Sequence, residues 1–311
     1  MHDAAIETEG LSKRYGRHGV LALDGLDMHV VPGEAFGFLG PNGAGKTTTI
    51  RLLLDLLRPT SGSARVLDID SGSGSLDIRR RLGYLPGELP FRGRETAATL
   101  LAFLGNLRGG VPTSRVHALA ERFDLDMDKP VRALSKGNKQ KVALVQAFMH
   151  EPELLILDEP SAGLDPLLQQ EFLALVREVR EQGRTIFMSS HILAEVDEVA
   201  DRVAVLRQGR LVTVESVANL RERAGHSTEI QFAHPVPPDA FDRIEGVHDP
   251  TVDGNVLRCV VVGSADALIK KAAQFTVERV SSSPPDLEAV FLAYYGESQA
   301  SSAEGGDGDA G

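Results

Sequence analysis

Short apolar runs alternate with longer amphipathic stretches along the first two thirds of the chain. EAFGFLG, LLILDEP and TIFMSS are apolar on both faces, as strands buried inside a sheet are. Between the last two lies LLQQEFLALVREVREQG, an amphipathic helix that we expect to end at Gly183. Strands that alternate with helices predict an α/β core with a parallel sheet.

Further elements extend this core. Residues 5–31 contain short β-like runs separated by turns, and VAVLRQGRLV predicts a hairpin around Gln208 and Gly209. TTTIRLLLDLLRP predicts a helix stopped by Pro59, and SARVLDI predicts a strand after it. RRRLGYLP predicts a helix end that leads into another strand.

Residues 93–150 have a helical pattern with no strong strand between the helices. The helical runs are RETAATLLAFLGNL, TSRVHALAERFDL and KGNKQKVALVQAFMH. This pattern predicts a helical insert over about residues 88–150, within a first domain that covers residues 1–218.

The pattern changes near residue 219. β-like runs at TEIQFA, NVLRCVVVG and FTVERV surround a helical DALIKKAAQ, which predicts a small α+β domain over residues 219–296. LEAVFLAYYG is expected to be its closing helix. The remaining residues, 297–311, are Gly, Ser and acid, a composition typical of disorder.

Composition narrows the class of protein. The chain has 311 residues and a formal net charge of -11, which disfavours a dedicated nucleic-acid binder, so no nucleic-acid partner is expected. Its one cysteine, Cys259, fits a reducing cytoplasm. The N-terminus does not have the pattern of a signal peptide. No apolar run approaches the roughly 18 residues of a membrane span, so we expect any membrane role to come through a partner.

GPNGAGKTT, at residues 40–48, matches the full G-x-x-x-x-G-K-[ST] pattern between a predicted strand and a predicted helix. Its glycines allow backbone N–H groups to surround phosphate oxygens. Lys46 is expected to contact the β and γ phosphates, and the Thr47 hydroxyl to hold Mg²⁺. The candidate nucleotide-binding residues here are Gly40, Asn42, Gly43, Ala44, Gly45, Lys46, Thr47 and Thr48.

Two acids end the buried strand LLILDEP. Acids at strand ends in an α/β sheet face the ligand crevice. Asp158 suits a Mg²⁺ ligand, and Glu159 can polarise an attacking water. Alternatively, the two acids form an ordinary acidic cap between the strand and a turn. The complete glycine loop upstream disfavours this alternative.

A second polar helix start, LSKGNKQK at residues 134–141, also has the features of a phosphate-binding site. In SAGLDP, Asp165 is either a functional residue or a plain helix N-cap. His191 follows the strand TIFMSS and is either a donor to phosphate or a structural histidine.

Four elements stand in one order: GPNGAGKTT, LSKGNKQK, LLILDEPSAGLDP and SSH. Together they resemble the ATP-binding cassette of ABC transporters, over about residues 5–215. The chain closely resembles the bacterial ABC-2 group of drug or antibiotic exporters. This resemblance implies a P-loop NTPase fold with a mixed sheet core, an antiparallel β part and a helical insert.

The resemblance also implies a mechanism. Two cassettes pair head to tail around ATP and Mg²⁺, and Ser135, Gly137 and Asn138 of one copy contact the nucleotide held by the other. ATP hydrolysis, with Glu159 as the base and with His191 and Lys46 beside it, then drives a separate integral membrane permease. We therefore expect a homodimeric exporter ATPase in the cytoplasm, on the inner face of the membrane.

The resemblance implies roles for two further residues. Tyr15, in LSKRYG, matches the aromatic residue that stacks on adenine, and Asp165 matches the loop that links the two sites.

The chain departs from the family pattern at two places. Its signature reads LSKGN where LSGGQ is commoner, so Lys136 and Asn138 replace Gly and Gln. At the junction of core and insert, where the family usually has a glutamine that contacts Mg²⁺, the stretch GYLPGELPF places Gly87, with Glu88 beside it. Either Glu88 substitutes for the glutamine, or Thr47, Asp158 and water hold the ion alone.

Other classes of function remain as alternatives. A soluble ABC-type ATPase of DNA repair or translation usually has a long coiled coil or a second cassette, and neither is evident in this sequence. A GTP-driven switch needs an N-K-x-D element, which the sequence lacks. A non-catalytic nucleotide-binding regulator is compatible with Gly87, although Glu159 argues against it.

Overall fold

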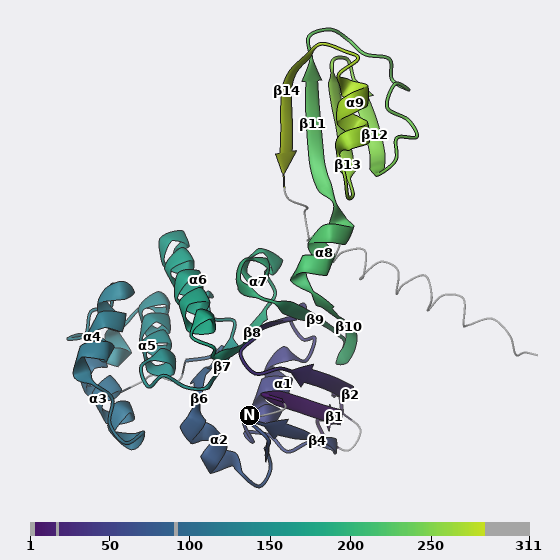
Figure 1. Ribbon diagram of the computed structural model, residues 1–311. Helices are drawn as coiled ribbons and strands as arrows, with labels where there is room; N and C mark the ends of the chain where they lie inside the picture. The colour runs from purple at the N-terminus through teal and green to yellow at the C-terminus, as the bar shows by residue number, and fades with distance from the viewer. Residues whose placement is uncertain (1–3, 17–18, 90–92, 284–311) are drawn as a thin grey trace, which may run out of the picture. The chain divides into compact units, whose positions relative to one another are not determined.

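The computed structural model describes residues 4–16, 19–89 and 93–283 (Figure 1). Contacts divide the chain into two compact units, Met1–Val214 and Glu215–Gly311. The predicted boundary at residues 218 and 219 falls inside a helix near the start of the second unit. Among the described residues, no helix combines the length and the apolar character needed to cross a bilayer.

A six-stranded sheet forms the core of the first unit, with the strand order β10-β9-β3-β8-β7-β6. β3 pairs in parallel with β8 and β9, and β7 pairs in parallel with β6 and β8. Phe187 is fully buried and its ring lies 5.9 Å from that of Phe36 and 5.2 Å from that of Phe38. The predicted parallel sheet is therefore confirmed. Its strands are β3 (Ala35–Leu39), β6 (Leu82–Leu85), β7 (Leu154–Asp158), β8 (Thr185–Ser190), β9 (Arg202–Arg207) and β10 (Arg210–Ser216).

A second, antiparallel sheet has the order β2-β1-β4-β5. Ile6 on β1 lies opposite Val30 on one side and Val66 on the other, and all three side chains are buried. The alternation of buried and exposed positions follows from the two-residue period of a strand. The strands are β1 (Ile6–Arg14), β2 (Leu21–Val30), β4 (Ser61–Val66) and β5 (Ile69–Asp70).

The first helix ends earlier than predicted. It was expected to continue to Pro59, but α1 spans Lys46–Leu53. Asp55 has a φ of 54°, and the N–H of Leu56 donates to the carbonyl of Arg51 at 2.8 Å. This is a Schellman ending, in which a left-handed residue closes the last turn. Local backbone geometry, and not the proline, therefore stops the helix.

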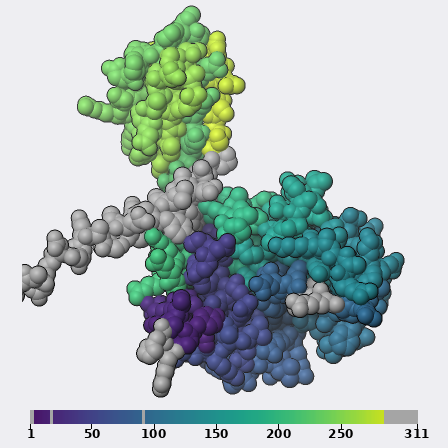
Figure 2. All heavy atoms as spheres, turned by 180° about the vertical axis from the view of Figure 1, so that it is seen from behind, coloured from purple at the N-terminus to yellow at the C-terminus, as the bar shows by residue number. Residues whose placement is uncertain are grey.

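The helical insert contains the three expected helices, α3 (Ala97–Leu107), α4 (Thr113–Arg122) and α5 (Lys136–Phe148), with a short 3-10 turn at Val131–Ala133. In the space-filling view of Figure 2, the insert forms a lobe continuous with the rest of the first unit. The remaining helices of this unit are α2 (Ser75–Arg81), α6 (Pro166–Glu181) and α7 (Leu193–Val199).

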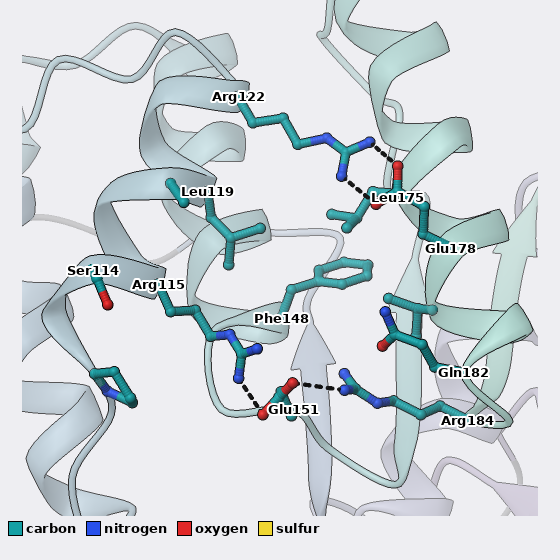
Figure 3. Close-up of a pocket in the computed structure, with 13 residues that line it drawn as sticks. Ser114, Arg115, Leu119, Arg122, Phe148, Glu151, Leu175, Glu178, Gln182 and Arg184 are labelled. Atoms are coloured by element: carbon teal, nitrogen blue, oxygen red, sulfur yellow. Dashed lines mark hydrogen bonds and ion pairs between the residues drawn. The ribbon is translucent and has the colours of Figure 1, made fainter.

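A groove of about 600 Å³ lies between α4 and α6 (Figure 3). Its floor includes Leu119, Phe148, Leu175 and Val179. Ion pairs bridge it at two places. Their members are Arg122 with Glu178 at one place, and Arg115 and Arg184 with a shared Glu151 at the other.

The second unit has its own sheet, with the order β12-β13-β11-β14, and its own core. Phe232 packs against Phe241 and Phe275, with ring centroids 5.6 and 5.7 Å away. Strands and helices together give the predicted α+β composition. The predicted helix at residues 287–296 and the tail at 297–311 lie outside the described residues. The elements are α8 (Val217–Ala224), β11 (His226–Phe232), β12 (Val247–Asp253), β13 (Val256–Val261), α9 (Asp266–Ala272) and β14 (Val277–Ser283).

Candidate functional site

The candidate site lies at the carboxyl edge of the six-stranded sheet. Leu39 of β3 is in register with Ser190 of β8, and Asp158 of β7 is in register with Ser189. The glycine loop, Glu159 and His191 follow directly after these strand ends. Because the strands are parallel, their following residues are brought to one edge, where ligands bind in α/β sheets.

Backbone conformation explains the glycines of the loop. Gly43 and Gly45 have φ values of 80° and 114°, in the region that favours glycine. A Cβ on Gly45 would lie 2.6 Å from the carbonyl oxygen of Ala22, and one on Gly40 would lie 2.5 Å from that of Leu206. The loop ends at the start of α1, whose first N–H groups suit an anion.

Lys46 is held inside this loop. Its side chain is 6% exposed, and its Nζ donates to the carbonyl of Gly40 at 2.5 Å. The same Nζ lies 3.1 Å from Oε1 of Glu159. The cation expected to contact phosphate is therefore paired with the carboxylate expected to act as the base.

Thr47 and Asp158 form the candidate metal site. The Thr47 hydroxyl donates to Oδ2 of Asp158 at 2.9 Å, and the Ser189 hydroxyl donates to Oδ1 at 2.6 Å. A hydroxyl and a carboxylate are the hard oxygen ligands that Mg²⁺ prefers, so the residues fit this ion. Within the described ranges, no group of three or more His, Cys, Asp or Glu side chains is placed to hold a metal without help. Nucleotide phosphates would supply the remaining ligands.

Glu159 has an unusual backbone and two side-chain contacts. Its φ is 49°, and its N–H donates to the carbonyl of Ser189 at 3.2 Å. Oε2 lies 2.6 Å from Nδ1 of His191, whose side chain is 47% exposed. His191 and Lys46 thus hold the carboxylate from two sides.

A pocket of about 580 Å³ opens beside these residues, and Thr47, Asp158 and Glu159 line one part of it. Tyr84, Gly87 and Glu88 line another part. Burial, together with the nearby Asp158 carboxylate, raises the pKa of Tyr84 to about 12. The tyrosine therefore stays neutral at physiological pH.

The other predicted nucleotide contacts are arranged around the loop. The Tyr15 hydroxyl lies 3.3 Å from Oγ1 of Thr48, and the ring is 42% exposed. Asn42 is exposed and Ala44 is buried within the loop. The ring predicted to stack on a base therefore lies beside the phosphate loop and is partly exposed, with Nζ of Lys13 5.7 Å from its centroid.

Ser135 is the N-cap of α5, and the residues around it form the second polar helix start. Ser135 is exposed and accepts hydrogen bonds from the backbone N–H and the side-chain amide of Asn138, at 3.3 and 3.1 Å. A Cβ on Gly137 would lie 2.7 Å from the carbonyl oxygen of Gly163, so only glycine allows this approach. Asp165 caps α6, because its Oδ1 accepts from the N–H groups of Leu167 and Leu168 at 3.1 Å.

Two residues of the site are absent from the sequence prediction. Ser189 holds the candidate metal carboxylate, and buried Gln140 donates to the carbonyl of Pro160 at 2.7 Å, which joins α5 to the turn after β7. The signal for Ser189 is its place at the polar end of an otherwise apolar strand. Gln140 lies within the predicted polar helix start LSKGNKQK, but its partner is distant in sequence.

Comparison with known proteins gives consistent matches. A family model described as ABC transporter matches residues 23–162. The Bacitracin transport ATP-binding protein BcrA of Enterococcus faecalis is 37% identical over 231 residues, which cover 73% of this chain and 74% of that protein. The Nod factor export ATP-binding protein I of Paraburkholderia xenovorans is 32% identical over 303 residues, covering 94% and 97%.

Solved structures include the ATP binding subunit of an ABC transporter. It superposes with a TM-score of 0.64 at 30% identity, covering 70% of this chain and 92% of the other. The predicted cassette fold is therefore confirmed.

Proposed function

This chain belongs to the ABC transporter family as an ATP-binding ATPase subunit, and we propose that two copies pair head to tail to power export through a separate membrane permease. Export is supported by relatives that are named for bacitracin transport and for Nod factor export. Binding to the proposed permease would hold the chain on the inner face of the cell membrane.

The observation that carries the proposed chemistry is the convergence of a cation, a hydroxyl and two carboxylates at one sheet edge. Lys46 and Thr47 begin α1, Asp158 ends β7, and Glu159 follows that strand directly. Phosphoryl transfer needs positive charge and a positioned nucleophile more than covalent chemistry. Thr47 and Asp158 would hold Mg²⁺, which neutralises phosphate charge when bound.

The residues of this chain then have distinct tasks. Lys46 exchanges its contact with Glu159 for the phosphates of ATP. Glu159, still held by His191, positions the attacking water and accepts its proton. Tyr15 stacks on the adenine ring and orients the nucleotide.

The second polar helix start completes the site in the partner copy. Ser135, Gly137 and Asn138 lie at the N-terminus of α5, and the start of a helix attracts a phosphate. Asp165 lies at the start of α6, beyond the turn that approaches Gly137, and is suited to link the two sites. ATP therefore stabilises the closed pair, and hydrolysis removes that stabilisation. Residues 219–296 are either a dimerisation module, a regulatory domain or a contact for the permease, and we favour dimer contact because the shared site requires two copies.

ATP turnover measured across protein concentrations tests this proposal. Turnover should rise more steeply than linearly with concentration, and Lys46→Ala, Glu159→Gln and Ser135→Arg should each abolish it. Ser114→Arg is the matched control, since Ser114 is an exposed serine at the start of α4 in the same insert. Linear turnover that survives Ser135→Arg would refute the shared site. Tight ATP binding without turnover would mean either that the glutamine replaced by Gly87 is needed or that catalysis requires the permease.

A further inference from the structure

Two buried polar side chains that the proposed mechanism does not use lie on either side of His191 in the sequence. Ser190 ends β8 and is 1% exposed, and Glu195 lies in the first turn of α7 and is 8% exposed. The hydroxyl of Ser190 lies 3.3 Å from Oε2 of Glu195. Burying a carboxyl group costs free energy unless it is hydrogen-bonded, and Ser190 supplies such a bond.

The Ser190 hydroxyl connects Glu195 to the backbone of the turn between β8 and α7. Its oxygen accepts a hydrogen bond from the N–H of Ile192 at 2.9 Å. Its single proton has two acceptors within reach, the carbonyl of Ile192 at 3.1 Å and Oε2 of Glu195 at 3.3 Å. A charged acceptor makes the stronger bond, so Glu195 attracts the proton and leaves the lone pairs of the hydroxyl to the Ile192 N–H.

The start of α7 depends on this hydroxyl. The N-cap residue, Ile192, has no side-chain cap among the described residues, and the helix spans only seven residues, Leu193–Val199. Helices this short have little stability of their own. An acid in the first turn also stabilises a helix through its dipole, but that effect operates at exposed positions and does not account for the burial of Glu195.

The same turn contacts the candidate site at two places. The carbonyl of Ser190 accepts from the N–H of Gly40 at 3.4 Å, where the chain enters the glycine loop. The next residue, His191, places its Nδ1 2.6 Å from Oε2 of Glu159. Because the His191 side chain is 47% exposed, packing alone does not fix its ring. The position of the ring therefore depends on the backbone that Ser190 and Glu195 hold.

We propose that Glu195 is a positioning residue for hydrolysis, which fixes, through the Ser190 hydroxyl, the turn that directs His191 to the Glu159 carboxylate. This inference rests on the function proposed above, in which Glu159 positions the attacking water. A displacement of about 1 Å in a reacting group can lower a rate by about 100-fold. Loss of the Glu195 carboxylate should therefore lower kcat by about 10- to 100-fold. The affinity for ADP should stay near that of the parent.

Long-range proton–nitrogen correlation spectra of the histidine rings test the position of His191 without relying on turnover. The signals of His191 are those lost in His191→Ala, and Glu159→Gln should move them because it changes the partner of Nδ1. Glu195→Ala should move them in the same direction. Glu195→Gln can still accept through its amide oxygen and should leave them near the parent. Unmoved His191 signals in Glu195→Ala would overturn the inference.

Glu198→Ala is the matched control for both measurements. Glu198 is an exposed acid on the same helix, and it pairs with Arg177 of α6. Its removal should leave the His191 signals and kcat unchanged. Signals that move equally in Glu198→Ala and Glu195→Ala would mean that any loss of charge on α7 displaces the ring, and would also overturn the inference.

A double-mutant cycle in the single-turnover rate at saturating ATP separates positioning from a general structural role. If Glu195 acts through His191, Glu195→Ala lowers the rate in the parent and not further in His191→Ala. Equal losses in both backgrounds would overturn the inference. If Glu195→Ala does not fold, Ser190→Ala removes the same hydrogen bond from the other side and replaces it in both measurements. Where turnover is below detection, the ring spectra alone decide.

Failure of the proposed function has a different signature. Turnover that survives Lys46→Ala and Glu159→Gln would show that the proposed site does not hydrolyse ATP, whatever the ring spectra show. Turnover that these two variants abolish, together with parent spectra and parent kcat in Glu195→Ala, would overturn the role of Glu195 alone.

Discussion

Replacing Glu159 by glutamine should strengthen the binding of ADP while it abolishes turnover. In the structure, Oε1 of Glu159 holds Nζ of Lys46 at 3.1 Å, within the loop expected to receive phosphates. A nucleotide must break this contact before Lys46 can turn to phosphate. Glutamine removes the charge that holds the lysine and that repels phosphate, yet keeps nearly the same size.

The geometry sets the size of the effect. At 3.1 Å and an effective dielectric constant of about 20, the Coulomb attraction is about 5 kcal/mol, most of which is offset by desolvation. Oε1 of Glu159 has no hydrogen-bond partner among the described residues, so its contact with Lys46 is an ion pair, worth about 0–1 kcal/mol when exposed and about 3–5 kcal/mol to break when buried. Glu159 is 21% exposed, which favours a value between these limits and nearer the lower one. Since about 1.4 kcal/mol is tenfold in affinity, ADP should bind about tenfold more tightly.

Calorimetric titration of ADP into the metal-free protein measures this directly, without interference from hydrolysis. His191→Ala is the control, because it removes the 2.6 Å contact to Oε2 of Glu159 but leaves the contact to Lys46. ADP affinity in this control should stay near that of the parent. Equal ADP affinity in the parent and in Glu159→Gln would refute the idea that the ion pair competes with phosphate.

Three more predictions follow from other parts of the first unit. Phe187→Ala removes a fully buried ring and should lower the free energy of unfolding by about 3–5 kcal/mol in urea titrations; a loss below 1 kcal/mol would contradict the packing. Burial and Arg108 lower the pKa of His150 to about 4, so the unfolded chain binds its proton first as pH falls. Stability should therefore be complete above about pH 6.5 and drop by at most about 2 kcal/mol at pH 5. His150→Gln should flatten that slope, and an unchanged slope would assign it to other groups. Tyr15→Ala should weaken ATP binding by about 1–3 kcal/mol of stacking, while Tyr15→Phe retains it; equal losses in both would exclude stacking.

Much of this architecture is predictable from sequence because its signals are local. The apolar runs at 35–39, 154–158 and 185–190 predict strands buried on both faces, and all three form in the central sheet. The glycine loop has a complete pattern whose residues are contiguous. Its expected neighbours, Asp158 and Glu159, come together with it because parallel strands share an edge.

Other features could not be predicted, because they depend on backbone conformation or on contacts between residues far apart in the sequence. Proline at 59 suggested the end of α1, but the left-handed Asp55 ends it before the chain reaches the proline. Ser189 holds Asp158 from a strand 31 residues away, and its polarity alone does not identify this partner. Gly87 departs from the expected glutamine, and only the three-dimensional structure shows that a Cβ there would lie 3.2 Å from Oδ2 of Asp158, so that a side chain would require Asp158 to shift slightly.

The ion pairs across the groove between α4 and α6 should make the contact between insert and core sensitive to salt and temperature. Arg122 with Glu178, and Arg115 with Glu151, bridge the insert to the core through long charged side chains at partly exposed sites. Dissolved salt screens such links, whereas heating lowers their desolvation penalty. The contact between insert and core should therefore lose stability in concentrated salt. On warming, it should lose less stability than the apolar packing inside either part.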